Sequence, residues 1–438
     1  MKEILCRATG LEEEQLEQAL LAAAYVFCVL GGYYVLKPLR EEIGLLVGKE
    51  YAPRLFFGTL LVMLVANPIF SSLMNRFTRA TFIKVIYRFF AANILLFIGI
   101  FKYLEASGQM PEAGQAVNVT GVAFWMGVCF FLWVSVYNLF AVSVFWALMA
   151  DLYDSRESKK LFGFLGAGGT LGGVIGSWIT KVLVDDVGPT NLLFITLILL
   201  EVAVQFMKRL TRDHVEPSRE AGESKPNALS GVTDVLKSPY LLGICLYIFF
   251  YSFTSSFLYF EQQYIVDAAL QSREARVDYY ATVAMIFNSA TLVIQLFLTG
   301  RLLPLFGLSV GLSLVPIVTV VGFLALSYEP SLMVLATFDI IRRTANYGIT
   351  RPSREALYTV VSRREKYLSK SFIDTFVYRA GDSIASGAFE AIKTFTKSMP
   401  VISLIAVGVG VFYSVVAWFL GKAQTRKAEE LERAGEEE

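Results

Sequence analysis

Residues 339–390 read DIIRRTANYGITRPSREALYTVVSRREKYLSKSFIDTFVYRAGDSIASGAFE, and this stretch decides the fold. Around Met333–Val361 and Tyr367–Thr396 the chain has the length of two membrane-crossing helices. A charged side chain at the centre of such a helix costs about 2.5–3.5 kcal/mol on insertion scales. The two helices therefore either hold one another through ion pairs or handle a charged solute. Their charged residues include Asp339, Arg342, Arg343, Arg351, Arg354, Lys370, Asp374, Arg379, Asp382 and Glu390.

The composition predicts an all-α protein that crosses the membrane many times. The chain has 438 residues, of which 55% are hydrophobic and 18% charged, whereas soluble domains carry about 25% charge. Its net charge of +1 favours no nucleic-acid partner. The four cysteines are dispersed and the one histidine is His214 in a polar loop, so we expect neither a disulfide framework nor a metal site. No nucleophile–base pair is visible, so we expect no enzyme activity and no cofactor.

Apolar runs of about 20 residues predict twelve transmembrane helices. A long polar interruption containing Pro217 and Pro226 divides them six and six. The expected domains are an N-terminal cytoplasmic segment (1–18), a first six-helix half (19–210), a cytoplasmic linker (211–238), a second half (239–421) and a charged cytoplasmic tail (422–438). The expected spans are 19–37, 54–75, 81–104, 121–150, 158–183, 190–210, 239–267, 278–303, 307–327, 331–360, 367–396 and 400–421.

The distribution of Lys and Arg predicts that both termini are cytoplasmic. The connections after the second, fourth, sixth and tenth spans are basic, while those after the third and ninth carry almost no Lys or Arg. Twelve spans in a pseudo-symmetric 6+6 bundle with a basic linker resemble the major facilitator architecture. Asn75, Arg76 and Arg79 partly match the loop motif of that superfamily. The segment from Asp154 into the fifth span also echoes the segment from Val361 into the eleventh, as expected of a transporter built from repeats.

Glycines in the fifth span predict close helix packing. Gly168, Gly172 and Gly176 are spaced four residues apart, and small residues at this spacing let two membrane helices approach closely. No Lys-Ser/Thr follows them, so we do not interpret them as a nucleotide-binding loop.

Polar stripes on the tenth and eleventh spans predict a charged interior. Polar residues recur every three to four positions on both helices, and neither helix can point such a stripe at lipid. The interior cations are mostly Arg, whose planar fork suits phosphate or carboxylate. A network of internal ion pairs is the alternative. The candidate substrate-binding residues are Lys37, Arg40, Arg343, Arg379, Tyr347, Tyr378 and Asn288, and the candidate gating or proton-coupling residues are Asp151, Glu261, Asp374, Asp382 and Lys370.

These residues give the sequence a resemblance to the ATP/ADP translocases, the nucleotide transporters of obligate intracellular bacteria and plastids, and more closely to their relatives in free-living bacteria. The resemblance covers nearly all twelve spans. It is strongest in RPSREALYTVVSRREKYLSKSFIDTFVYRAGD, which starts at Arg351, and it is recognisable in YYVLKPLREE from Tyr33 and in FWALMADLYDSRESKKLF from Phe145.

The resemblance implies roles for single residues. In the family's first-helix motif Leu-Arg-Asp-x-Lys-Asp, Lys37 stands at the Arg, Arg40 at the Lys and Glu41 at the second Asp, while Pro38 replaces the first Asp. Asp151 stands at a Glu of the fourth helix, and Glu261 corresponds to an acid of the seventh. Lys370 and Asp374 match the eleventh-helix motif, whereas Asp382 replaces a Lys there. That reversal of charge and Pro38 argue against exchange of polyphosphates.

The sequence therefore predicts a secondary active transporter of a nucleotide or another phosphorylated anion, working by alternating access through exchange or proton coupling. We expect a monomer in the bacterial inner membrane. Two alternatives remain open: a transporter of a different organic anion or amphiphile, and a membrane scaffold or sensor that transports nothing.

Overall fold

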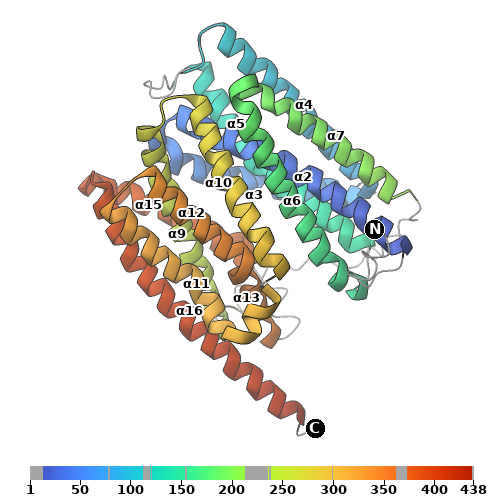
Figure 1. Cartoon of the computed structure of the whole chain (residues 1–438), viewed down its shortest axis with the longest axis vertical. Helices are drawn as coiled ribbons and strands as arrows, with labels where there is room; N and C mark the ends of the chain where they lie inside the picture. The colour runs from blue at the N-terminus through green and yellow to red at the C-terminus, as the bar shows by residue number, and fades with distance from the viewer. Residues whose placement is uncertain are drawn as a thin grey trace. The chain divides into compact units, whose positions relative to one another are not determined.

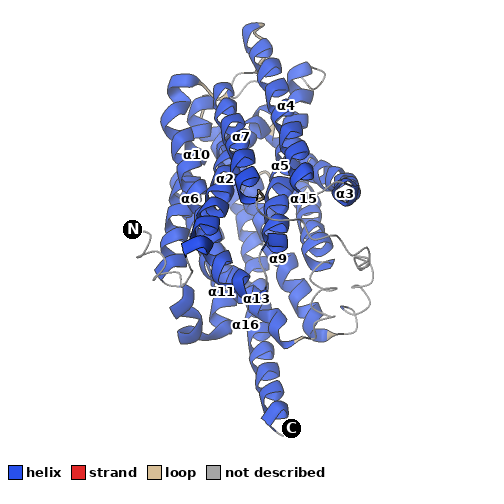
Figure 2. Cartoon of the chain, turned by 90° about the vertical axis from the view of Figure 1, so that its right-hand side faces the viewer, coloured by secondary structure: helices blue, strands red, loops and turns tan. Residues whose placement is uncertain are grey.

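The computed structural model describes residues 13–76, 79–111, 119, 121–152, 155–212, 235, 238–297, 299–361 and 372–436. Within these ranges every element is helical and no strand is present (Figure 2). The chain forms two compact units, which are described separately. The expected N-terminal segment and central linker lie mostly outside the described residues.

The first unit is a bundle of long helices built around α2 (Figure 1). Helix α2 contacts α5, α6 and α7, and α4 contacts α5 and α7. The unit also takes α3 from Leu61 onward and α10 up to Leu292. Its elements are α2 (Glu13–Val47), η1 (Lys49–Tyr51), α3 (Ala52–Arg76), α4 (Arg79–Ala106), α5 (Val122–Leu152), α6 (Ser155–Val187), η2 (Thr190–Leu192), α7 (Leu193–Leu210) and α10 (Arg273–Phe297).

The second unit contains the start of α3, the end of α10 and the rest of the C-terminal half. Helix α9 packs against α15 and α16, and α11 packs against α12 and α16. Helix α16 has 38 residues, so it is longer than the roughly 20 residues that a bilayer needs, and its end projects past its neighbours (Figure 1). Its other elements are α9 (Pro239–Ala269), α11 (Thr299–Tyr328), α12 (Leu332–Ala345), η3 (Asn346–Thr350), α13 (Arg351–Ala356), η4 (Leu357–Val360), η5 (Ile373–Val377), α15 (Tyr378–Phe395) and α16 (Met399–Glu436).

Ten of these helices are long and apolar enough to cross a membrane, and they correspond to ten of the twelve expected spans. The other two expected spans, 331–360 and 367–396, are the segments with the dense charges. The first is divided into α12, η3, α13 and η4, and the second contains η5 before α15. Both η3 and η5 are π-helical turns. The two charged segments are therefore also the irregular ones, and π-helical turns are frequent at functional sites.

Glycines on α6 determine how closely α2 approaches. A Cβ atom on Gly172 would lie 2.4 Å from the Phe27 carbonyl oxygen, and one on Gly176 would lie 2.3 Å from the Gly31 carbonyl oxygen. These are contacts with backbone atoms, which cannot rotate away. The α2–α6 interface is therefore the close glycine packing that the four-residue spacing predicts.

Buried tyrosines satisfy backbone carbonyls inside each unit. In the first unit the Tyr25 hydroxyl donates to the Tyr87 hydroxyl, which donates to the Ala141 carbonyl at 3.0 Å. In the second unit Tyr247 donates to the Leu312 carbonyl at 3.0 Å and Tyr240 to the Leu357 carbonyl at 2.7 Å. These bonds offset the cost of burying phenol groups.

Candidate functional site

Helix α2 carries a pair of cations on one face. Lys37 and Arg40 are three residues apart and both are half-buried, and α2 continues as one helix past Pro38. The Lys37 ammonium lies 5.5 Å from the centre of the Tyr34 ring and 5.4 Å from that of Phe287 on α10. These are cation–π distances.

Arg40 also lies against an aromatic ring. Its guanidinium carbon is 3.8 Å from the centre of the Phe131 ring on α5. Its Nη1 donates to Glu41 Oε1 at 2.9 Å. Two neighbouring turns of α2 therefore each present a cation over an aromatic face.

Asn288 lies beside the same part of α2. Its side chain is buried and donates to the Ala284 carbonyl at 2.8 Å. A Cβ atom on Gly173 of α6 would lie 3.0 Å from the Tyr34 ring and 3.1 Å from Asn288 Cγ. The first unit therefore brings Asn288, Lys37 and Tyr34 to one region between α2, α6 and α10.

In the second unit, Arg343 and Arg379 each pair with an acid on their own helix. Arg343 Nε donates to Asp339 Oδ1 at 2.6 Å, and the Asp339 side chain is buried. Arg379 Nη1 lies 3.5 Å from Asp382 Oδ2. Internal ion pairs, the alternative that the sequence left open, are thus present at Arg40, Arg343 and Arg379.

The remaining candidates of the second unit lie on α15, η3 and α9. The Tyr378 ring centre is 6.1 Å from that of Tyr251 on α9. The Tyr347 carbonyl accepts from Gln295 Nε2 at 3.4 Å. Glu261 is buried in α9 and accepts a hydrogen bond from the Ser403 hydroxyl of α16 at 2.8 Å, while its Oε1 has no partner among the described residues.

Three predicted gating residues cannot be placed. Lys370 lies outside the described residues, and so do the side chains of Asp151 on α5 and Asp374 on η5. Among the residues that are described, no group of three or more His, Cys, Asp or Glu side chains could hold a metal ion.

A buried arginine on α12 was missed by the sequence analysis. Arg342 is 4% exposed, and its guanidinium donates to the Ser255 hydroxyl at 2.6 Å and to Thr319 at 3.2 Å. It also lies over the Tyr251 ring at 5.4 Å. The expected polar stripe ran through its neighbour Arg343. The signal that could have identified Arg342 is the row of hydroxyl residues on α9, Thr254 to Ser256, which can accept from a guanidinium.

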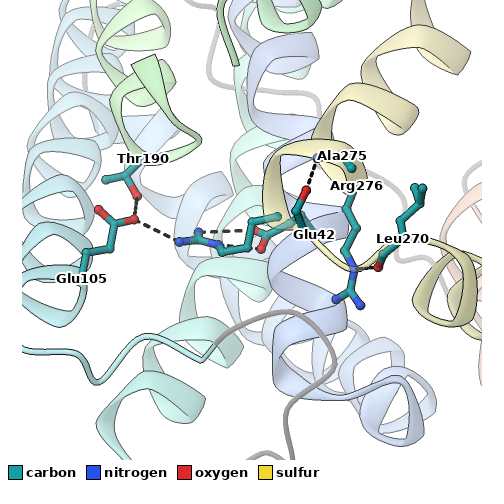
Figure 3. Close-up of polar contacts among 8 residues, drawn as sticks. Glu42, Glu105, Thr190, Leu270, Ala275 and Arg276 are labelled. Atoms are coloured by element: carbon teal, nitrogen blue, oxygen red, sulfur yellow. Dashed lines mark hydrogen bonds and ion pairs between the residues drawn. The ribbon is translucent and has the colours of Figure 1, made fainter. Parts of the chain in front are cut away.

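A second missed cluster joins four elements of the first unit (Figure 3). Arg273 at the start of α10 donates to Glu42 of α2 at 2.8 Å and to Glu105 of α4 at 3.0 Å. Glu105 also accepts from the Thr190 hydroxyl of η2 at 2.6 Å. Beside this cluster lies a pocket with room for about one water molecule. The expected span began at residue 278 and therefore left Arg273 in a loop.

Glu42 lies near the C-terminal end of α2. The Glu42 side chain is completely buried, and its carboxylate faces Arg273. Arg276, which is also buried, donates to the Leu270 carbonyl at 3.0 Å in the turn before α10 (Figure 3). The two arginines therefore hold the start of α10 and the turn that precedes it.

Replacement of Arg273 by glutamine should destabilise the first unit by about 3 kcal/mol, because the buried Glu42 carboxylate loses its main partner. Nearby Arg276 acts on Glu42 electrostatically, which keeps the loss at the lower end of the usual range. Thermal melting of the purified protein measures this loss of stability. The control is Arg426→Gln, since Arg426 and Glu430 near the end of α16 are exposed and 3.8 Å apart and such pairs contribute little. Equal melting temperatures for Arg273→Gln and wild type would contradict the structural role of the cluster.

Comparisons with known proteins agree with this architecture. Residues 140–353 match the sequence profile of the Major Facilitator Superfamily. A bacterial homologue of the human lysosomal transporter Spinster has a TM-score of 0.55 and 15% identity, covering 93% of this chain and 98% of that one. A mutant of the nucleoside transporter NupG has a TM-score of 0.60 and 12% identity, covering 92% of this chain and 98% of that one.

No curated protein sequence matches the chain, so the resemblance to ATP/ADP translocases stays a prediction. Structural likeness at 12–15% identity shows the fold alone. The fold class predicted from the sequence is thus supported by a profile and by two solved structures. The chain is an all-helical, multi-pass membrane protein with the fold of the Major Facilitator Superfamily transporters.

Proposed function

We propose that this protein is a secondary active transporter of a nucleotide or another phosphorylated anion, working by alternating access. The observation that carries the proposal is the pair of cations on α2, Lys37 and Arg40, each over an aromatic ring inside a membrane-spanning helix. Cations bind phosphate oxygens, and aromatic faces stack on planar bases. In this proposal Lys37, Arg40 and Asn288 bind the solute in the first unit.

The Arg343–Asp339 ion pair supports a site whose charge is partly compensated when it is empty. Arg343 Nε lies 2.6 Å from Asp339 Oδ1, so an incoming anion competes with the Asp339 carboxylate. Such competition suits exchange or coupled transport, because Arg343 is not left with uncompensated charge. We assign Arg343, Arg379, Tyr347 and Tyr378 to solute binding. The proposed gating or proton-coupling residues are Asp151, Glu261, Asp374, Asp382 and Lys370.

A second candidate function is transport of a weakly charged solute, such as a nucleoside. Of the four predicted anion-binding cations, Arg40 and Arg343 already have carboxylate partners, which lowers the positive charge available for a polyphosphate. One solved structure with this fold is that of a nucleoside transporter. This candidate differs from the first in the charge of the solute and not in the mechanism.

Ligand-dependent melting separates the two candidates. Purified protein is heated with ATP, ADP, AMP, adenosine or inorganic phosphate, and a ligand at 100 times its Kd stabilises by about 2.7 kcal/mol. A higher melting temperature with a phosphorylated nucleotide supports the first function, and a shift with adenosine alone supports the second. If no phosphorylated compound raises the melting temperature of folded protein, the nucleotide proposal fails.

We also propose that the protein lies in the bacterial inner membrane with both termini in the cytoplasm. The proposal rests on the basic connections after the second, fourth, sixth and tenth spans. A green fluorescent protein fused after Glu438 should therefore fluoresce, and alkaline phosphatase fused at the same residue should be inactive. The opposite pair of results would show that the C-terminus is outside.

A further inference from the structure

Asp382 of α15 lies in a cluster of oxygen atoms inside the second unit. Its side chain is buried, and its Oδ1 lies 2.5 Å from the Ser252 hydroxyl and 2.8 Å from the Ser256 hydroxyl, both on α9. The Ser252 oxygen is also 2.7 Å from the Tyr378 carbonyl oxygen. Gly381 permits this approach, since a Cβ atom there would lie 2.9 Å from the Phe249 carbonyl oxygen.

The cluster has three short oxygen–oxygen contacts, but its two serines supply only two hydroxyl hydrogens to form hydrogen bonds there. Ser252 has one hydroxyl hydrogen, yet its oxygen makes two short contacts, to the Asp382 carboxyl and to the Tyr378 carbonyl. One hydrogen shared between two acceptors does not give two contacts this short. Ser256 donates its own hydrogen to Oδ1 and cannot supply the missing one. The contact between Asp382 and Ser252 therefore needs a proton that the serines do not carry.

We propose that Asp382 is the proton-binding site of the transporter and that it carries a proton in this conformation. The carboxylic acid donates from Oδ1 to the Ser252 oxygen, and Ser252 donates to the Tyr378 carbonyl. Each of the three short oxygen–oxygen contacts then contains one hydrogen. This inference rests on the proposed transport function, because a bound proton has a consequence only where a solute moves with it.

The surroundings of Asp382 are consistent with a neutral acid. Arg379 lies one turn away on the same helix, and its Nη1 is 3.5 Å from Oδ2. An ionised aspartate normally holds a guanidinium at about 2.7–2.9 Å, as Asp339 holds Arg343 at 2.6 Å. Among the described residues, the other titratable groups near Tyr378 and Asp382 are the phenols of Tyr251 on α9, Tyr347 on η3 and Tyr378 itself. None of these three groups is a cation that could stabilise an ionised Asp382.

The proton controls the charge at Arg379. When Asp382 is protonated, the Asp382–Arg379 pair carries a net charge of +1, which attracts an anion. When the acid gives its proton to water, the Ser252 hydrogen turns to Oδ1, the carboxylate attracts Arg379 and the pair becomes neutral. Proton binding and anion binding therefore favour one another, which makes the coupled process a symport of anion and proton.

Infrared difference spectroscopy of the purified full-length protein in lipid tests the proposal without a substrate. A protonated aspartic acid has a carboxylic C=O stretching band, and we expect Asp382→Asn to lose one such band. One variant identifies the group: Asp339→Asn should keep the band, because Asp339 is ion-paired. In Ser252→Ala, where Asp382 is intact, the Asp382 band should shift, because its acceptor is gone.

Two results would overturn the inference. One is identical carboxylic bands in wild type, Asp382→Asn and Ser252→Ala. The other is a melting temperature that rises with Na⁺ only when Asp382 is present, which would assign the oxygen cluster to sodium. In liposomes that transport a nucleotide, uptake by Asp382→Asn should lose its response to a pH gradient. An absence of nucleotide uptake with the infrared bands as expected would contradict the proposed substrate and leave the proton site standing.

Discussion

Replacement of Lys37 by glutamine should raise the KM for nucleotide uptake about 10- to 100-fold. A hydrogen bond to a charged group contributes about 1.5–3 kcal/mol, and each 1.4 kcal/mol is a factor of ten in affinity. Glutamine keeps most of the length of the side chain and removes the charge. Initial rates of labelled nucleotide uptake into liposomes, measured over a range of concentrations, give the KM.

The chain offers a close control for this variant. Lys102 of α4 lies 5.5 Å from the centre of the Phe194 ring, so it makes the same cation–π contact as Lys37 on another helix of the same unit. Lys102→Gln should leave the KM unchanged. Equal KM values for Lys37→Gln and wild type would show that Lys37 does not touch the solute.

Replacement of Gly176 by alanine should destabilise the first unit by more than about 3 kcal/mol, at or above the upper end for overpacked cores. The new methyl group would lie 2.3 Å from the Gly31 carbonyl oxygen and 3.0 Å from its carbon. Relief requires α2 and α6 to separate, and α2 also packs against α5 and α7. The variant should melt at a lower temperature and give less monodisperse protein in size-exclusion chromatography.

Gly166 on the same helix is the matched control, because nothing lies within 4 Å of a Cβ atom there. Gly166→Ala should melt at or slightly above the wild-type temperature, since alanine is the better helix former. If both alanine variants melt like wild type, the close approach of α2 and α6 is wrong.

The helices could be predicted from the sequence because apolar runs are long and local. The ten candidate spans agree with expected spans, and the Gly168, Gly172 and Gly176 spacing predicted the close α6 interface. These features depend on residues that are neighbours in the chain. The breaks at η3 and η5 did not follow from hydropathy, because a π-helical turn inserts one residue without changing composition.

The partners of the charged residues could not be predicted, because they depend on contacts between distant helices. Spacing placed Lys37 and Arg40 on one face of α2 but did not show that Phe287 and Phe131 lie against them. Arg273 was missed for the same reason, since Glu42 is 231 residues away in the chain. The sequence predicted a charged interior, and the structure shows which acids Arg40, Arg273 and Arg343 contact.

Uptake of labelled ATP, ADP and AMP into liposomes that contain the purified protein tests the central claim most directly. The account predicts saturable uptake of at least one nucleotide above that of protein-free liposomes, competition by the unlabelled compound, and strong reduction in Lys37→Gln but not in Lys102→Gln. Folded protein that takes up none of the three nucleotides under an imposed pH gradient or with nucleotide inside would contradict it.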